Sequence, residues 1–108
     1  CAGALAWFET GVTDSFGGLG PLRGGLGLLR GSHCPYYDGD PERRPTYHRL
    51  IASGELEPGI AVDVGVALRY EDGRLVETVA QKPGVHAWRV TVHDGTIDEQ
   101  RLTPRLLP

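Results

Sequence analysis

The chain has 108 residues, 40% of them hydrophobic, with 11 basic and 14 acidic residues that give a formal net charge of −3. The charges are mixed along the sequence, so we expect no basic surface that would neutralise phosphates and no nucleic-acid partner. No apolar run approaches the roughly 20 residues needed to cross a bilayer, so we expect no membrane partner. Two cysteines are too few for a disulfide framework, which favours a reduced, cytoplasmic setting.

The N-terminal third is rich in glycine and predicts short elements. Ala2 to Phe8 combines alanines with large apolar side chains, which predicts a buried helical turn leading away from Cys1. From Glu9 to Gly31 glycines alternate with short apolar pairs, so most of this stretch is expected to be loop. Leu26 to Leu29 predicts a short buried strand, and the chain leaving it places His33 at a strand end, where side chains commonly enter a site.

One helix is predicted in the middle of the chain. Asp40 is a suitable N-cap, Pro41 suits the first helical position, and Gly54 is the expected stop. Three apolar residues fall three to four positions apart and define its buried face: Tyr47, Leu50 and Ile51.

From Ile60 onward the apolar pattern has a period of two. Ile60–Tyr70 and Leu75–Ala80 are predicted strands joined across Asp72-Gly73, a dipeptide typical of hairpins. A third strand, Ala87–His93, is expected to reach a second Asp-Gly turn before a short tail. The C-terminal half is therefore predicted to be an antiparallel meander.

Cys1 is the first candidate for chemistry. Small residues follow it, which lets the backbone turn sharply and lets a substrate approach the Ala2 N–H that would hold an oxyanion. A helix N-terminus also favours a thiolate. His33 is a candidate base, although a buried, hydrogen-bonded histidine is the commoner case, and Asp14 could simply cap a turn. No His, Cys and acid set has zinc-ligand spacing, so we expect no metal and no cofactor.

Four segments in order give the chain a family resemblance: Cys1 to Glu9, Thr13 to Phe16, Gly31 to Pro35 and Tyr37 to Pro45. Together they resemble the peptidase E family, the bacterial α-aspartyl dipeptidases. The resemblance implies an α/β fold, the C-terminal half of a class I glutamine amidotransferase-like (flavodoxin-like) three-layer domain. Residues 1–108 are then expected to be the C-terminal part of a single domain, completed by an N-terminal chain.

The same resemblance implies a catalytic triad. Its nucleophile is a serine in the family and Cys1 here, and its base matches His33. The orienting acid varies among relatives, and Asp14 is the first choice, with Asp63 and Glu9 behind it. The position that aligns with the later acid of related cyanophycin-degrading enzymes is Val64, which departs from that pattern. In each case the base takes the proton of the nucleophile and the acid fixes its tautomer.

The cysteine at the position of the family's serine can be explained in three ways. Cys1 is a working thiol nucleophile, or the chain has cut itself immediately before Cys1, or the chain is an engineered or proteolysed fragment. Natural cleavage, with the N-terminal half of the precursor as a second chain, is the expectation that we carry forward, together with a homodimer of this two-chain unit as an option.

The expected activity is hydrolysis of a peptide or amide bond, with dipeptides that begin with Asp as the first guess. Arg43 and Arg44 could hold a substrate carboxylate as a bidentate fork, and Tyr37 could line the same pocket. A solvated charged face explains the arginines equally well. The alternatives are a catalytically retired binding or regulatory subunit, or an amidase or acyl-transfer enzyme acting on a non-peptide substrate.

Overall fold

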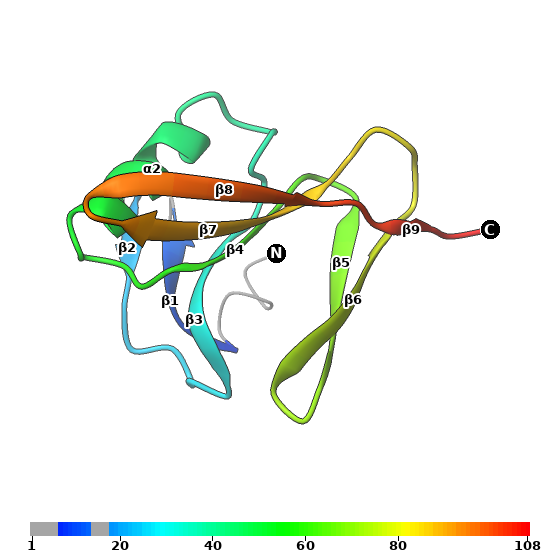
Figure 1. The fold of residues 1–108 in the computed structure, drawn as a ribbon, viewed down its shortest axis with the longest axis horizontal. Helices are drawn as coiled ribbons and strands as arrows, with labels where there is room; N and C mark the ends of the chain where they lie inside the picture. The colour runs from blue at the N-terminus through cyan, green and yellow to red at the C-terminus, as the bar shows by residue number, and fades with distance from the viewer. Residues whose placement is uncertain (1–6, 14–17) are drawn as a thin grey trace.

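The computed structural model describes residues 7–13 and 18–108, which form two β-sheets and a helix (Figure 1). The helix is α2 (Arg43–Ala52). The strands are β1 (Phe8–Thr13), β2 (Gly20–Leu22), β3 (Leu29–Cys34), β4 (Gly59–Val62), β5 (Val66–Glu71), β6 (Arg74–Ala80), β7 (Ala87–His93), β8 (Thr96–Leu102) and β9 (Arg105–Leu106). The chain is thus a mixed α/β structure.

The larger sheet has six strands in the order β2-β1-β3-β4-β7-β8. Its centre is parallel, because β3 pairs in parallel with both β1 and β4, whereas β2, β7 and β8 add antiparallel partners. Gly59 permits the close β3–β4 approach, since a Cβ there would lie 2.0 Å from the carbonyl oxygen of Ser32. Parallel strands that end side by side are compatible with the expected α/β domain.

The smaller sheet, in the order β5-β6-β9, stands beside the larger one (Figure 1). Its hairpin turns at Asp72 and Gly73, both with positive φ (50° and 78°), as the Asp-Gly signal predicts. Asp94 and Gly95 repeat this geometry between β7 and β8.

Two apolar clusters cover opposite faces of the larger sheet. One includes Tyr47, Leu50 and Ile51 of α2, and confirms the predicted buried face of that helix. The other joins Ile60 and Val62 of β4 to side chains of the β5–β6 hairpin. Because successive strand residues point to opposite faces, β4 contributes to both layers, with Ala61 on the helix side and Ile60 and Val62 on the other.

The helix boundaries are close to those predicted. Glu42 occupies the N-cap position without a side-chain cap, whereas Asp40 accepts a hydrogen bond from the Glu42 N–H (2.9 Å) one turn earlier. Asp40 therefore orders the turn before the helix and does not cap it. Gly54, with φ +83°, follows the C-cap Ser53 and ends the helix as expected.

Several predicted elements are wrong. Phe8 begins a strand and not the end of a helical turn, and part of the expected Glu9–Gly31 loop forms β1 and β2. The strand expected over Leu26–Leu29 lies later, as β3. These strands are stabilised by partners distant in sequence, which local composition does not reveal.

The C-terminal meander is also corrected. The strand expected over Ile60–Tyr70 is broken by Asp63-Val64-Gly65, where Gly65 has φ +92°, so β4 and β5 join different sheets. The expected tail contains β8, which pairs along its length with β7, and β9, which pairs in parallel with β6. No helix in the described part of the chain is long and apolar enough to cross a membrane.

Candidate active site

His33 lies near the C-terminal end of β3, as predicted, on the sheet face opposite α2. Its neighbour Ser32 points toward the helix and shares a 2.6 Å hydrogen bond with the Tyr47 hydroxyl. Alternation along the strand therefore turns His33 toward the β5–β6 side. The His33 residue is 2% exposed, and the ring of Phe8 stacks on its imidazole with centroids 4.7 Å apart and planes 10° from parallel.

The hydrogen bond of His33 fixes its tautomer. Nδ1 lies 2.9 Å from the carbonyl oxygen of Ile60. A carbonyl oxygen only accepts, so Nδ1 carries the proton and Nε2 keeps its lone pair. Burial, which disfavours the imidazolium, lowers the His33 pKa to about 4, although the Ile60 bond acts in the opposite direction. At neutral pH the ring is neutral, with Nε2 ready to accept a proton.

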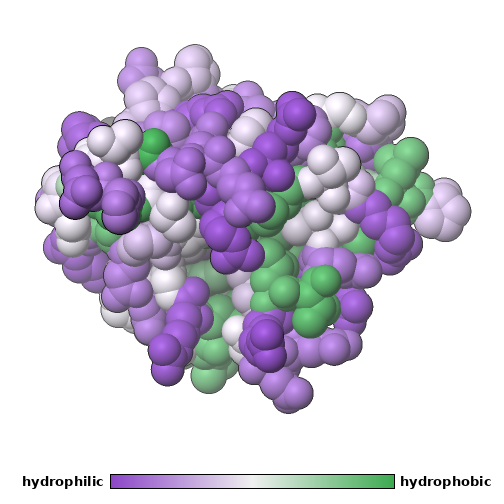
Figure 2. Space-filling view, in the orientation of Figure 1, coloured by the Kyte–Doolittle hydropathy of each residue, from purple (hydrophilic) through white to green (hydrophobic). Residues whose placement is uncertain are grey.

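A cavity of about 830 Å³ lies beside this histidine, between the larger sheet and the β5–β6 hairpin. His33 lines it together with Phe8 and with residues from the ends of β3 and β4 and from β5. Figure 2 shows hydrophobic residues gathered between the two sheets. The volume falls within the range of about 300–1,000 Å³ typical of small-ligand sites.

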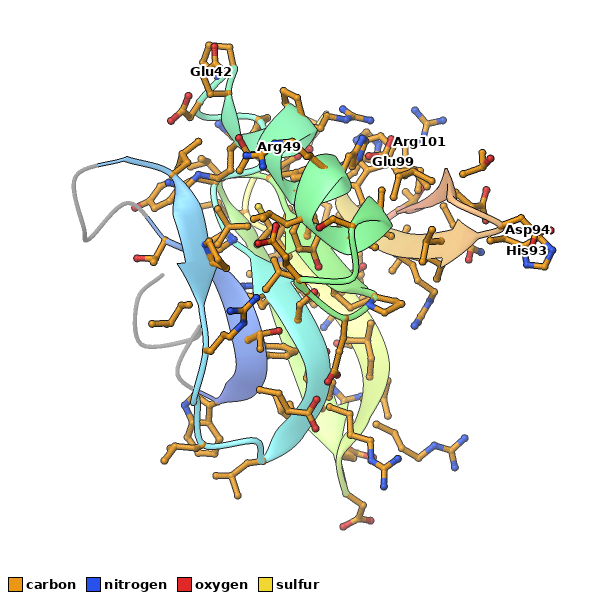
Figure 3. All side chains as sticks on the ribbon, turned by 90° about the vertical axis from the view of Figure 1, so that its left-hand side faces the viewer. Glu42, Arg49, His93, Asp94, Glu99 and Arg101 are labelled. Carbon is orange, nitrogen blue, oxygen red and sulfur yellow. The ribbon has the colours of Figure 1, made fainter. Side chains whose placement is uncertain are left out.

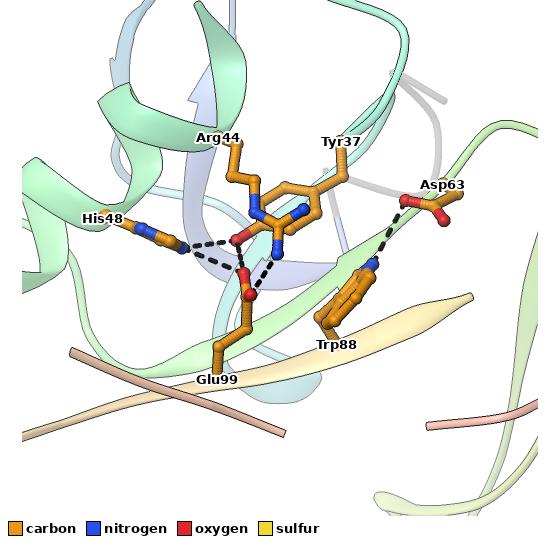
Figure 4. Close-up of polar contacts among 6 residues, drawn as sticks. All are labelled: Tyr37, Arg44, His48, Asp63, Trp88 and Glu99. Carbon is orange, nitrogen blue, oxygen red and sulfur yellow. Dashed lines mark hydrogen bonds and ion pairs between the residues drawn. The ribbon is translucent and has the colours of Figure 1, made fainter. Parts of the chain in front are cut away.

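Asp63, one of the expected alternative acids, also lines this cavity and is 7% exposed. Its Oδ2 accepts a hydrogen bond from the backbone N–H of His86 (2.8 Å), and its Oδ1 accepts one from Nε1 of Trp88 (3.2 Å; Figure 4). Neither bond involves His33. Asp63 therefore ties the turn after β4 to β7 and places a negative charge at the cavity wall.

Glu9, the other alternative acid, is half-buried and engages the beginning of β3. Its Oε2 accepts a hydrogen bond from the Gly31 N–H at 3.3 Å. A hydrogen bond with the side chain of Glu57 lowers the pKa of Glu9 and raises that of Glu57, as expected for two carboxyl groups that share a proton. Neither contact involves His33.

Two of the expected substrate-binding residues belong to one polar group, the Glu99 cluster, defined as Tyr37, Arg44, His48 and Glu99. Both Tyr37 and Arg44 bond the Glu99 carboxylate, and Nε2 of His48 lies 2.6 Å from the Tyr37 hydroxyl (Figure 4). The Arg44 guanidinium carbon also lies 4.6 Å from the ring centroid of Trp88. Figure 3 shows Glu99 on β8 beside α2.

The charges of this cluster satisfy one another. Burial alone would raise the pKa of Glu99, but hydrogen bonds from Tyr37, Arg44 and His48 outweigh it and lower that pKa. Burial and the bond to Glu99 together raise the pKa of Tyr37. Arg44 thus joins α2 to β8, and Tyr37 joins the turn before α2 to the same strand, on the sheet face away from His33.

Arg43, the third expected substrate-binding residue, is 5% exposed and lies closer to the cavity. Its guanidinium carbon is 5.9 Å from the ring centroid of Tyr36, a residue that lines the cavity. The structure therefore separates the two neighbouring arginines instead of bringing them together as one fork.

The remaining expected site residues, Cys1, Ala2 and Asp14, lie outside the described residues. Within residues 7–13 and 18–108, no three His, Cys, Asp or Glu side chains form a group that could hold a metal ion. Sequence reasoning did not identify Phe8 or the Ile60 carbonyl as partners of His33. The first was assigned to a helix, and a backbone oxygen carries no side-chain signal.

Comparison with known proteins identifies the family of this chain. The model of Peptidase family S51 matches residues 1–78. Over 106 residues the chain is 46% identical to the "Uncharacterized peptidase YgaJ" of Bacillus subtilis (strain 168), a match that covers 98% of this chain and 46% of that protein. The chain thus spans about half the length of this curated relative. No solved structure matches the chain. Because the family model covers more than half of the chain, the chain belongs to peptidase family S51.

Proposed function

We propose that this chain carries the nucleophile and the general base of a hydrolase of peptide or amide bonds. Family membership supports the hydrolase class. The observation that carries the proposal is His33: a neutral imidazole whose Nδ1–H is held by the Ile60 carbonyl and which lines a cavity large enough for a small substrate.

In the proposed reaction, Nε2 of His33 takes the proton of the Cys1 thiol as its sulfur attacks the substrate carbonyl carbon. The resulting oxyanion is held by backbone N–H groups, that of Ala2 among them. His33 then gives the proton to the leaving amine, and water hydrolyses the thioester with His33 again as base. The Ile60 carbonyl keeps the tautomer that both steps need.

The identity of the acid in the triad is proposed separately. Asp63 and Glu9 are engaged by other groups, so Asp14 is the acid that we propose. It would stabilise the transient imidazolium, a role that the neutral Ile60 carbonyl performs less well than a carboxylate.

Completion of the site by an N-terminal half of the same domain is likewise proposed, supported by the 46% coverage of the Bacillus subtilis relative. Cleavage immediately before Cys1 can be tested by intact-mass analysis of a product that extends upstream. Self-cleavage predicts that the product splits before Cys1 and that a Cys1→Ala variant stays whole. If both products stay whole, self-cleavage is excluded.

Hydrolysis is tested with fluorogenic aminoacyl amides, a panel that includes the expected aspartyl substrate. The expected result is turnover that Cys1→Ala abolishes and His33→Gln lowers by about 10²–10⁴-fold, the usual contribution of a general base. His93→Gln is the matched control, because His93 is 91% exposed at the β7–β8 turn (Figure 3). A protein that turns over none of the panel but still binds peptides would instead be the retired, regulatory family member.

A further inference from the structure

We propose that a groove beside the His33 cavity binds the C-terminal carboxylate of a peptide substrate, through Arg89 with Arg30 and Arg74 around it. The proposal rests on the proposed function and deepens it, because it concerns the part of the substrate that leaves after the bond is cut. Three features support it: the place of the groove next to the cavity, its positive charge and its distance from His33.

The groove has a volume of about 470 Å³ and lies between the larger sheet and the tip of the β5–β6 hairpin. Its lining comes from the beginnings of β3 and β4, from β7 and from both sides of the hairpin turn. In Figure 1 the hairpin tip lies beside the beginning of β3. The groove shares Tyr70 and Gly73 with the His33 cavity, so an extended ligand can occupy both.

The lining of the groove is positively charged, although the chain carries a formal net charge of −3. Three of the 11 basic residues of the chain line it, Arg30, Arg74 and Arg89, and no described lining residue is Asp or Glu. None of these three arginines forms an ion pair with a carboxylate of the described residues, whereas Arg44, like others, does. Guanidinium groups bind carboxylates with two parallel hydrogen bonds, so the groove favours an anionic ligand.

The register of the larger sheet places Arg89 on the same face as His33. His33 pairs with Ile60 of β4, Ile60 pairs with Arg89 of β7, and directly paired residues point to the same face. Neighbouring strands lie about 4.8 Å apart, so the backbones of His33 and Arg89 are about 10 Å apart. Three extended peptide residues span about the same distance. A carboxylate three residues beyond the cut bond would therefore come within reach of Arg89.

Tyr70 lies between the two sites and adds a hydrogen-bond donor. Its ring packs edge-on against Phe8, with centroids 5.9 Å apart, and Phe8 in turn stacks on His33. Burial raises the pKa of Tyr70, and the positive charge of Arg89 opposes that rise, as expected for a guanidinium near the phenol. The Tyr70 hydroxyl is therefore protonated at neutral pH and can donate to the same carboxylate as Arg89.

The three arginines are not equivalent. The pKa of Glu9 is lowered by its hydrogen bonds with Glu57 and the Gly31 N–H and also by the positive charge of Arg30, so Arg30 already interacts with an acid. Arg74 follows the hairpin turn and is exposed. Arg89 extends from a central part of the sheet next to Tyr70, and binding is expected to depend on it most.

The test is a binding measurement that needs no catalysis. The protein, together with any segment that precedes it and with Cys1→Ala to prevent turnover, is titrated calorimetrically with the tetrapeptide Asp-Ala-Ala-Ala and with the same peptide ending in an amide. We expect the free acid to bind about tenfold more tightly than the amide, the usual effect of a hydrogen bond to a charged group. The net negative charge of the chain opposes this preference, so the preference reports the local site.

One pair of variants locates the effect. Arg89→Gln is expected to weaken binding of the acid about tenfold and to leave binding of the amide unchanged. Arg101→Gln is the matched control, because Arg101 is an exposed arginine on the neighbouring strand β8 (Figure 3). It pairs with Trp88, which packs on the helix side of the sheet, so its side chain lies on the opposite face and its substitution should change neither affinity.

Failure of the acid to bind, equal affinities of acid and amide, or equal effects of the two variants would each overturn the proposal. Inorganic phosphate is titrated in parallel: phosphate binding that needs Arg89, without any advantage of the acid over the amide, would make the groove a site for free anions and refute the peptide carboxylate.

The hydrolysis assay separates this proposal from the proposed function. Turnover of the aminoacyl amides without a preference for the acid peptide refutes the carboxylate site alone. A preference for the acid that depends on Arg89, without any turnover, supports the carboxylate site and refutes the hydrolase.

Discussion

The low pKa of His33 makes a quantitative prediction about stability. The ring is buried and neutral when the protein is folded, with a pKa of about 4, against about 6.5 for an exposed histidine. The unfolded chain therefore binds more protons between these values, so the free energy of unfolding falls as pH is lowered through this range. The full difference corresponds to about 3 kcal/mol, which is present above pH 6.5 and lost near pH 4.

Urea unfolding of the wild type and of His33→Gln at pH 7.5 and at pH 4 isolates this effect, because the other titrating groups are common to both proteins. The stability advantage of the wild type should shrink by about 3 kcal/mol at the lower pH. His93→Gln, which alters a fully exposed ring, should follow the wild type at both values. Equal pH dependence of wild type and His33→Gln, or an NMR titration of His33 near pH 6.5, would refute a buried neutral imidazole.

Three further predictions concern packing and reactivity. Gly59→Ala should destabilise the protein by about 3 kcal/mol in urea unfolding because the new Cβ meets the Ser32 carbonyl, whereas Gly20→Ala, with open space around it, should cost little. Glu99→Gln should lower the free energy of unfolding by about 1–3 kcal/mol through weaker bonds to Arg44 and Tyr37, with exposed Asp98→Asn near zero as the control; equal effects would contradict the role of the cluster. Cys34, fully buried and with its pKa raised to about 12 by burial, should react with thiol reagents only after unfolding, and labelling in the native state would contradict this placement.

The elements that were predicted correctly are those formed by residues close together in the sequence. The helix has its apolar face at Tyr47, Leu50 and Ile51 and its stop at Gly54, and both Asp-Gly turns adopt positive φ. These features need only the residues that form them.

The elements that the sequence failed to predict depend on distant partners. β1 lies between β2 and β3, and β8 is rich in polar residues because one of its faces is exposed, so neither looks like a strand in isolation. The break at Gly65 is hidden because the apolar alternation continues on both sides while the backbone crosses from one sheet to the other.

In the candidate site, too, the sequence predicted a residue that local signals mark and missed the contacts made by distant segments. His33 was identified from its place after a strand and from the family resemblance, and it lies on the cavity wall. Its tautomer is fixed by the carbonyl of Ile60, and which backbone oxygen lies opposite a ring is a property of the β3–β4 register. Arg44 and Tyr37 were grouped with the substrate by their nearness in sequence, but their partner Glu99 comes from a segment that was expected to be a tail.

The most direct test of the central claim is covalent trapping of the acyl-enzyme. The protein is mixed with an aminoacyl ester, quenched in acid and mapped by mass spectrometry. We expect an acyl group on the Cys1 thiol and none on Cys34, and we expect the acyl group to form at least about 10²-fold more slowly in His33→Gln than in His93→Gln. Equal acylation rates in these two variants, or turnover of the ester with the acyl group on another residue, would contradict that claim.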